Sequence, residues 1–123
     1  MFTLYCLKLK APGRYYVGYC PTWRWKRRLK EHSSKQGALW TRIHGFCSVF
    51  WIRELDVLES EVRRLEDLEC CKILQKHGWN SCRGGLFNLR SDVTEAPAWI
   101  TRPYLDAKAE IDSATQRLIL VDQ

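Results

Sequence analysis

Long apolar segments are missing from this sequence, since no run approaches the roughly 20 residues that cross a membrane. The first ten residues, MFTLYCLKLK, also lack the basic start and long apolar block of a secretory signal. Internal repeats and low-complexity segments are absent as well. We therefore expect a cytoplasmic protein, with association with the nucleoid left open, that is neither secreted nor bound to a membrane.

Acidic residues are scarce in the first part of the chain. Residues 1–53 carry eleven lysines and arginines against one acid, Glu31, whereas residues 54–123 carry nine against thirteen acids. The first part is thus +10 and the second −4, which gives the net charge of +6. Such a one-sided basic field attracts a polyanion, most often nucleic acid. The alternative is a solvated basic helix that aids solubility.

Paired metal-binding cysteines are also missing. The six cysteines form no C-x-x-C motif, and none stands beside a suitably spaced pair of histidines, so a zinc knuckle has little support. Disulfides are not expected in a chain without a secretory signal. Most of these cysteines lie in apolar segments and are expected to be small buried residues.

The secondary structure expected from the sequence alternates between strands and helices. β-Branched and aromatic residues predict strands at 2–9, 14–20 and 43–53. Helical spacing and stop signals predict helices at about 23–33, 55–76 and 103–119. This order predicts an α/β (α+β) fold with a small three-stranded, mainly antiparallel sheet flanked by helices and an added C-terminal helix.

Three further local features are expected. Thr22 can cap the first helix, and residues 34–42 are expected to form a polar loop. Residues 1–90 would form the main domain, and residues 91–123 would be an extension packed on it.

The first predicted helix carries the densest positive charge. Arg24, Arg28 and His32 are spaced i, i+4, i+8 and share one face, while Trp25 and Leu29 beside them point to the core. Arg28 and His32 are therefore expected at the edge of the buried face. A guanidinium there can grip a phosphate through two hydrogen bonds, and a histidine one turn away can donate to the same phosphate or relay a proton.

The rest of this helix suits contacts with a nucleic-acid backbone. Lys26, Arg27 and Lys30 face away from the core, and together with Arg24 they can follow a row of phosphates. Trp23, Trp40 and Trp79 can stack on unpaired bases or belong to the core.

Two tyrosines are expected at one end of the hairpin. Tyr5 lies in the first strand and Tyr16 in the second, and a phenol can position or deprotonate an attacking water. Gly18 would allow close approach of a backbone or substrate. Each tyrosine alone is better explained as a core residue with a satisfied hydroxyl, but the basic helix that follows favours a site.

Several short motifs occur in a recognisable order. Tyr16-Val17-Gly18 stands eleven residues after Tyr5, RRLKEH supplies an R-x-x-x-H pattern with Arg28 and His32, and KQGALWT follows. In this order and spacing, residues 2–88 resemble the GIY-YIG nuclease family. After the long helix, the segment CRGG at 82–85 is similar to a V-R-G-G segment in one subgroup of that family.

The resemblance implies a metal-dependent endonuclease that hydrolyses phosphodiester bonds in DNA by in-line attack of water. Tyr5 and Tyr16 would orient or activate the water, and Arg28 and His32 would bind the scissile phosphate. One glutamate of the long helix would hold a single Mg²⁺ or Mn²⁺ ion, which keeps several of its waters.

We assign the metal-binding glutamate to Glu66. It borders the predicted inner face of Leu58, Val62 and Leu65, and it lies twelve residues before Gly78, as the resemblance suggests. Glu69 is the close competitor. For either residue the alternative is a role as a salt-bridge partner.

The segment after the long helix also has two interpretations. Glycines at 84 and 85 let backbone N–H groups approach a phosphate, and Arg83 would add charge, although an ordinary helix-stopping turn explains these three residues slightly better. Phe87-Asn88 resembles a Tyr-Asn pair that follows the catalytic helix in the family, and Asn80 is the other candidate for that asparagine.

Two other classes of function stay open at this point. The chain can be a nucleic-acid-binding module that keeps the fold without catalysis, or an interaction domain whose basic face meets an acidic protein. Duplex, branched and single-stranded DNA all remain candidate substrates, and the sequence does not indicate the oligomeric state.

Overall fold

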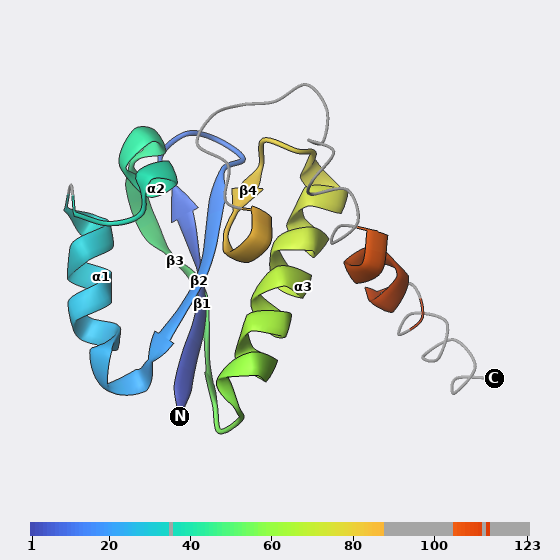
Figure 1. The fold of residues 1–123 in the computed structure, drawn as a ribbon. Helices are drawn as coiled ribbons and strands as arrows, with labels where there is room; N and C mark the ends of the chain where they lie inside the picture. Colours follow the sequence, from blue (N-terminus) through green and yellow to red (C-terminus); the bar gives the residue numbers. More distant parts are fainter. Residues whose placement is uncertain (35, 88–104, 112, 114–123) are drawn as a thin grey trace.

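The computed structural model describes residues 1–34, 36–87, 105–111 and 113. These residues form a mixed α/β fold in which helices flank a four-stranded sheet (Figure 1). The strands, in the spatial order β3-β1-β2-β4, are β1 (Phe2–Leu9), β2 (Tyr15–Pro21), β3 (Phe46–Leu55) and β4 (Cys82–Arg83). The three expected strands are confirmed as antiparallel neighbours, and the two-residue β4 adds a parallel pairing with β2.

The helices begin and end close to the expected positions, with one addition. They are η1 (Thr22–Arg24), α1 (Trp25–Ser33), α2 (Leu39–His44), α3 (Glu59–His77) and η2 (Gly85–Phe87). Residues 34–42 are not wholly a loop as expected, because α2 begins inside them at Leu39. A loop is expected there because the segment is largely polar, but α2 buries two of its side chains, Trp40 and Thr41.

Two expectations about helix starts are wrong. Thr22 does not cap α1 with its side chain, since its hydroxyl accepts a hydrogen bond from the Thr3 hydroxyl at 3.0 Å. Leu58 was expected on the inner face of the long helix, but α3 begins one residue later and the Leu58 side chain is exposed. Val62, by contrast, is fully buried as predicted.

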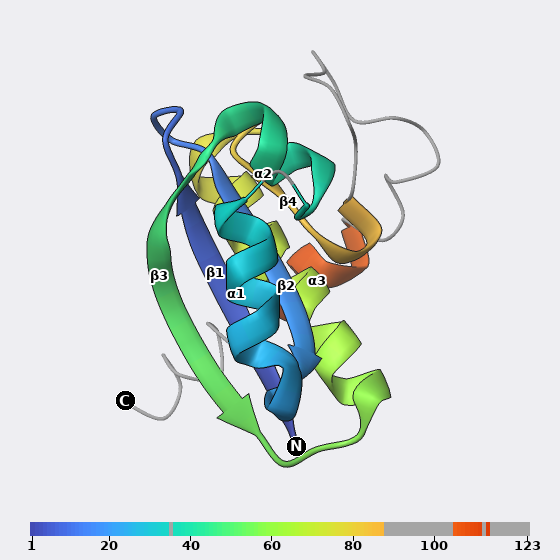
Figure 2. The ribbon, with the colours of Figure 1, turned by 90° about the vertical axis from the view of Figure 1, so that its left-hand side faces the viewer.

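The sheet separates two layers of core. On the face covered by α3, Leu4, Cys6 and Val17 pack against side chains of that helix, of which Leu68, Cys70, Cys71 and Leu74 are buried. On the other face, Tyr5, Leu7 and Leu9 pack with Trp40, and α1 and α2 cover this layer (Figure 2). Side chains alternate between the faces of a strand, so the hairpin contributes side chains to both layers of the core.

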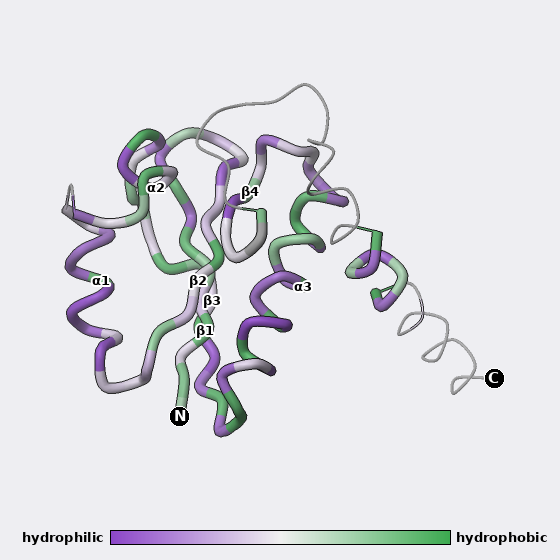
Figure 3. The backbone as a smooth tube through the Cα atoms, viewed as in Figure 1, coloured by the Kyte–Doolittle hydropathy of each residue, from purple (hydrophilic) through white to green (hydrophobic). Residues whose placement is uncertain are grey.

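The hairpin register places the two candidate tyrosines on one face. Tyr5 lies opposite Gly18 and Leu7 lies opposite Tyr16, and residues paired across antiparallel strands point to the same side. That side is the one covered by α1. Hydrophilic residues run along α1 in Figure 3, and Lys26, Arg27 and Lys30 of this helix are exposed.

The cysteines behave largely as the composition suggests. Five of the six are buried, and Cys47 on β3 is exposed.

Within the described residues no helix is long and apolar enough to cross a membrane.

Part of the expected C-terminal helix lies within the described residues. Residues 105–111 are helical, Ala107 is buried in the α3 layer of the core, and Glu110 pairs with Arg64 of α3. Asn88 and most of the predicted extension over 91–123 fall outside the described residues, so the proposed domain boundary stays a prediction.

Candidate active site

Tyr5, Tyr16 and His32 form a buried cluster between the sheet and α1. The Tyr5 hydroxyl and His32 Nε2 are 2.8 Å apart and share a hydrogen bond. The Tyr16 ring lies 6.5 Å from the Tyr5 ring and 5.3 Å from the His32 ring, measured between centroids. Tyr5 and His32 are almost fully buried, whereas Tyr16 is partly exposed. Tyr16 is therefore the tyrosine of this cluster that solvent reaches.

Gly18 makes this packing possible. A Cβ atom at this position would lie 2.7 Å from the Tyr5 hydroxyl oxygen and 2.9 Å from Cε1 of Tyr16. The space above Gly18, which we had expected a backbone or substrate to approach, is thus filled by the two phenol rings. The glycine acts through the tyrosines rather than by direct contact with a ligand.

Arg28 lies between the phenols and solvent. Its guanidinium lowers the pKa of both tyrosines, although burial is the larger effect and raises each pKa above its ordinary value. Arg28 Nη1 also donates to Glu31 Oε2 at 2.7 Å. Its side chain keeps 26% of its surface exposed, so an anion can reach it from outside.

The Glu31 carboxylate contacts three arginines. Its Oε1 atom lies 3.5 Å from Arg24 Nη2 and 3.7 Å from Arg27 Nε, in addition to the contact with Arg28. The hydrogen bond from Arg28 is the main reason that the pKa of Glu31 is lowered. A phosphate at Arg28 would have to share the guanidinium with this carboxylate.

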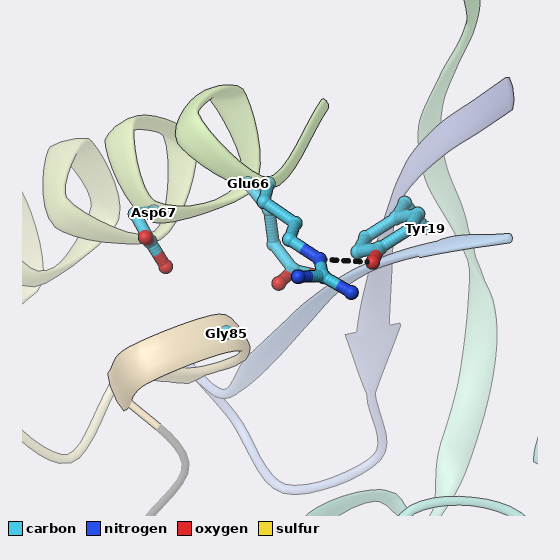
Figure 4. Close-up of a pocket in the computed structure, with 5 residues that line it drawn as sticks. Tyr19, Glu66, Asp67 and Gly85 are labelled. Atoms are coloured by element: carbon cyan, nitrogen blue, oxygen red, sulfur yellow. Dashed lines mark hydrogen bonds between the residues drawn. The ribbon is translucent and has the colours of Figure 1, made fainter. Parts of the chain in front are cut away.

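Glu66 lines a pocket on the α3 side of the sheet. The pocket has a volume of about 390 Å³ and is bounded by Tyr19, Arg63, Glu66, Asp67 and Gly85. Figure 4 shows Glu66 and Asp67 reaching from α3 toward the Gly85 turn, with Tyr19 on the facing strand. Glu66 is 8% exposed, and within the described residues its side chain forms no hydrogen bond or salt bridge. Its oxygens are not among the fully buried unpartnered atoms of the described residues, so the carboxylate opens onto the pocket.

The electrostatics of Glu66 favour a positive ligand in the pocket. Burial raises the pKa of the Glu66 carboxyl to about 8, the negative charge of Asp67 acts in the same direction, and Arg63 opposes both. Within the described residues no group of three acidic, histidine or cysteine side chains could hold a metal ion. A site with one or two carboxylates still suits Mg²⁺ or Mn²⁺, which keep several waters as ligands.

The Gly84–Gly85 turn joins the pocket to the sheet. A side chain at Gly84 would overlap the Val17 carbonyl oxygen of β2, and one at Gly85 would overlap the carboxylates of Glu66 and Asp67. Both glycines have positive φ angles, 150° and 52°. The two glycines therefore do more than stop a helix, because they let the turn close against both β2 and the acidic pair.

The two halves of the site meet around the open edge of β2. Strand β4 pairs only with Tyr15 and Tyr16, so it does not cover the rest of β2 on this side. The charge of Glu66 acts on Tyr16 from the α3 side, and that of Arg28 acts on it from the α1 side. Burial is the largest cause of the raised pKa of Tyr16, Arg28 opposes it and Glu66 adds to it, so charges from both faces of the sheet influence this phenol.

Two of the predicted residues have other contacts than expected. His32 does not face outward as a phosphate donor in this arrangement, because Nε2 is engaged by Tyr5 and Nδ1 is buried without a hydrogen-bond partner among the described residues. Arg83 adds no surface charge, since it is 1% exposed, donates to the carbonyl oxygens of Trp79 and Cys82, and stacks 4.3 Å from the Trp40 ring centroid.

The remaining predicted residues lie as their sequence positions suggest. Lys26, Arg27 and Lys30 are exposed on α1. Glu69, the competitor of Glu66, accepts hydrogen bonds from Arg53 at 3.0 Å and Lys72 at 3.1 Å, which makes it a salt-bridge residue. Asp67 is not among the residues predicted for the site, although its position directly after Glu66 in the sequence indicates a second carboxylate near the metal.

The burial of His32 predicts a loss of stability in acid. Burial, assisted by the charge of Arg28, lowers the pKa of His32 to about 4. Because the unfolded histidine titrates near 6.5, protonation favours the unfolded state, and stability present at neutral pH is lost as the pH falls below about 6.5. From this group alone we expect the free energy of unfolding to drop by roughly 2–3 kcal/mol between pH 7 and 4.5.

Urea unfolding across this pH range measures the effect. His32→Asn should flatten the acid limb of the stability curve, whereas His77→Asn, at an exposed position, should leave it unchanged. An acid limb as steep in His32→Asn as in the wild type would show that other groups cause the loss.

Comparison of this chain with models of protein families, with curated proteins and with solved structures finds no match. The interpretation of the site therefore rests on its own geometry and chemistry.

Proposed function

We propose that the protein is a metal-dependent endonuclease of the GIY-YIG type that hydrolyses phosphodiester bonds in DNA. The observation that carries this proposal is the cluster of Tyr5, Tyr16 and His32, with Arg28 one turn before His32 on α1, together with Glu66 in a pocket on the other face of the sheet. Cleavage of a phosphodiester needs a cation that balances growing negative charge and a group that orients the attacking water. These groups come from three separate segments of the chain.

Each residue would have a distinct role in this reaction. Arg28 would bind the scissile phosphate, and Tyr16 would orient the water. Because burial raises the pKa of Tyr16, its phenol stays protonated at neutral pH and acts by hydrogen bonding rather than as a base. Tyr5 and His32 are positioning residues, since their mutual hydrogen bond fixes the surface on which Tyr16 and Arg28 rest.

Glu66, with Asp67 beside it, would hold the Mg²⁺ or Mn²⁺ ion. The fit rests on a buried carboxylate that faces a pocket without a hydrogen-bond partner in the described residues. A bound divalent ion supplies positive charge to the phosphate and lowers the pKa of a bound water.

The alternative of a nucleic-acid-binding module without catalysis has one observation in its favour. Glu31 binds Arg28 at 2.7 Å and partly neutralises the arginine that the reaction would need. Binding alone requires only the exposed charges of α1, whereas the buried Glu66 carboxylate has no role in it. The two functions therefore differ in their dependence on Glu66.

Glu66→Gln should abolish cleavage of DNA while leaving DNA binding intact, because the amide keeps the shape of the side chain but not its affinity for a cation. Glu69→Gln is the matched control, since Glu69 is equally buried on the same helix but is held by Arg53 and Lys72. It should keep most of the activity. Cleavage rates and DNA affinities of both variants, with Mg²⁺ and with Mn²⁺, measure the difference. Normal cleavage by Glu66→Gln and none by Glu69→Gln would show that the metal ligand is Glu69, about one turn further along α3.

Arg28→Ala should lose far more cleavage than Arg27→Ala. Both arginines contact Glu31, so each variant removes one charge from the same cluster, but Arg27 keeps 79% of its side chain exposed and points away from the phenols. Removing a preorganised donor of this kind costs about 10²–10³ in rate. Single-turnover rates at saturating protein separate this loss from weaker binding. Equal, small losses in both variants would mean that the arginines only track the DNA backbone.

A further inference from the structure

Trp23 is an exposed aromatic side chain at the start of the basic helix. It lies in η1, between the end of β2 and the first residue of α1, and 81% of its surface is exposed. Among the large apolar side chains that the structure describes as exposed, this fraction is the highest. An indole carries a large apolar surface and is usually covered in a folded protein.

The other tryptophans among the described residues are covered or engaged. Trp25 packs 4.7 Å from the Tyr5 ring, Trp40 is 1% exposed, and Trp51 lies under the guanidinium of Arg53. Trp79 packs against the α3 layer of the core. Core packing therefore accounts for these four side chains but not for Trp23.

The surroundings of Trp23 are strongly basic. Arg24 follows it directly with 39% of its side chain exposed, and Lys26, Arg27 and Lys30 are exposed along α1. Glu31 is the only acid in residues 1–53. A partner held by this surface carries repeated negative charge, and a partner that also covers an indole offers a flat aromatic face.

A nucleic-acid strand with an unpaired base combines these two properties. In a duplex the faces of the bases are covered by their neighbours, so only an unpaired base or a strand end can stack on a side chain. An acidic peptide would satisfy the lysines and arginines but has no regular aromatic face. The charge complementarity and the exposed indole together favour single-stranded DNA.

We propose that Trp23 is a stacking platform for an unpaired base, so that the substrate of the α1 surface is single-stranded or partly unpaired DNA. This proposal rests on the proposed nuclease function and narrows its substrate class. Trp23 lies in the turn that leads directly into α1, five residues before Arg28. A strand that follows the basic residues of α1 would thus pass the indole at the start of the helix.

Binding without divalent metal tests the proposal separately from catalysis. Fluorescence anisotropy in EDTA would compare a labelled oligothymidylate with a fully paired, blunt-ended duplex of equal phosphate number, for the wild type, Trp23→Ala and Trp23→Phe. Leu58→Ala is a matched control, because Leu58 is 78% exposed in the segment before α3. We expect Trp23→Ala to lose about 5- to 100-fold in affinity for the single strand and less than about twofold for the duplex. Trp23→Phe should retain most of the affinity, and Leu58→Ala all of it.

Intrinsic tryptophan fluorescence provides a second readout. Binding of the single strand should quench emission in the wild type, and Trp23→Phe should lose the larger part of that quenching. Equal losses for single strand and duplex in Trp23→Ala, or no loss, would overturn the stacking role while leaving the nuclease proposal in place. Absence of DNA binding by the wild type would overturn both.

Two further outcomes would contradict the assignment of the partner. If single-stranded RNA binds more tightly than DNA with the same dependence on Trp23, the polymer is wrongly assigned. If Trp23→Ala converts a dimer into a monomer in analytical ultracentrifugation, the indole is covered by a second copy of the chain rather than by a base.

Discussion

The close contact between the Gly84–Gly85 turn and the edge of β2 holds the candidate site together. Side chains at these two positions would overlap the Val17 carbonyl oxygen and the carboxylates of Glu66 and Asp67. Because neither glycine has a side chain, the turn lies directly against Val17 of β2 and against the acidic pair of α3. Among the described residues, β4 pairs only with Tyr15 and Tyr16, and the turn continues the contact as far as Val17. The turn thus links the strand that carries Tyr16 to the helix that carries Glu66.

The same arrangement explains why polar groups are buried on both sides of the sheet. On the α1 side, the Tyr5–His32 hydrogen bond satisfies two of them at 2.8 Å, and the neutral imidazole avoids placing a second positive charge beside Arg28. On the α3 side, Glu66 has no hydrogen-bond partner within the described residues. Its carboxylate instead opens onto the pocket that it lines, where a cation can reach it, while His32 Nδ1 on the other face is buried without a partner among the described residues.

Much of the fold could be predicted from sequence because its signals are local. β-Branched and aromatic residues predicted three strands, and helical spacing and stop signals predicted the helices around Arg28 and Glu66. The cluster of Tyr5, Tyr16, Arg28 and His32 followed from a hairpin and one helix.

Other features depend on contacts between distant segments and could not be predicted in the same way. Helix α2 lies in a largely polar segment of the sequence, yet it buries Trp40 in the core. Arg83 is also buried, with its guanidinium stacked on that tryptophan. His32 was expected to face a phosphate, but its partner is Tyr5, which lies 27 residues away in sequence. Asp67 gains its place in the pocket only through the turn at Gly85.

The central claim is that the groups around Tyr16 form a metal-dependent active site and not merely a basic surface. Incubation of the purified protein with supercoiled plasmid and with single-stranded DNA, in Mg²⁺, in Mn²⁺ and in EDTA, tests this claim most directly. The account predicts strand cleavage with either metal ion and none in EDTA. DNA binding by a folded protein that cleaves neither substrate under any of these conditions would contradict it and would favour the binding module.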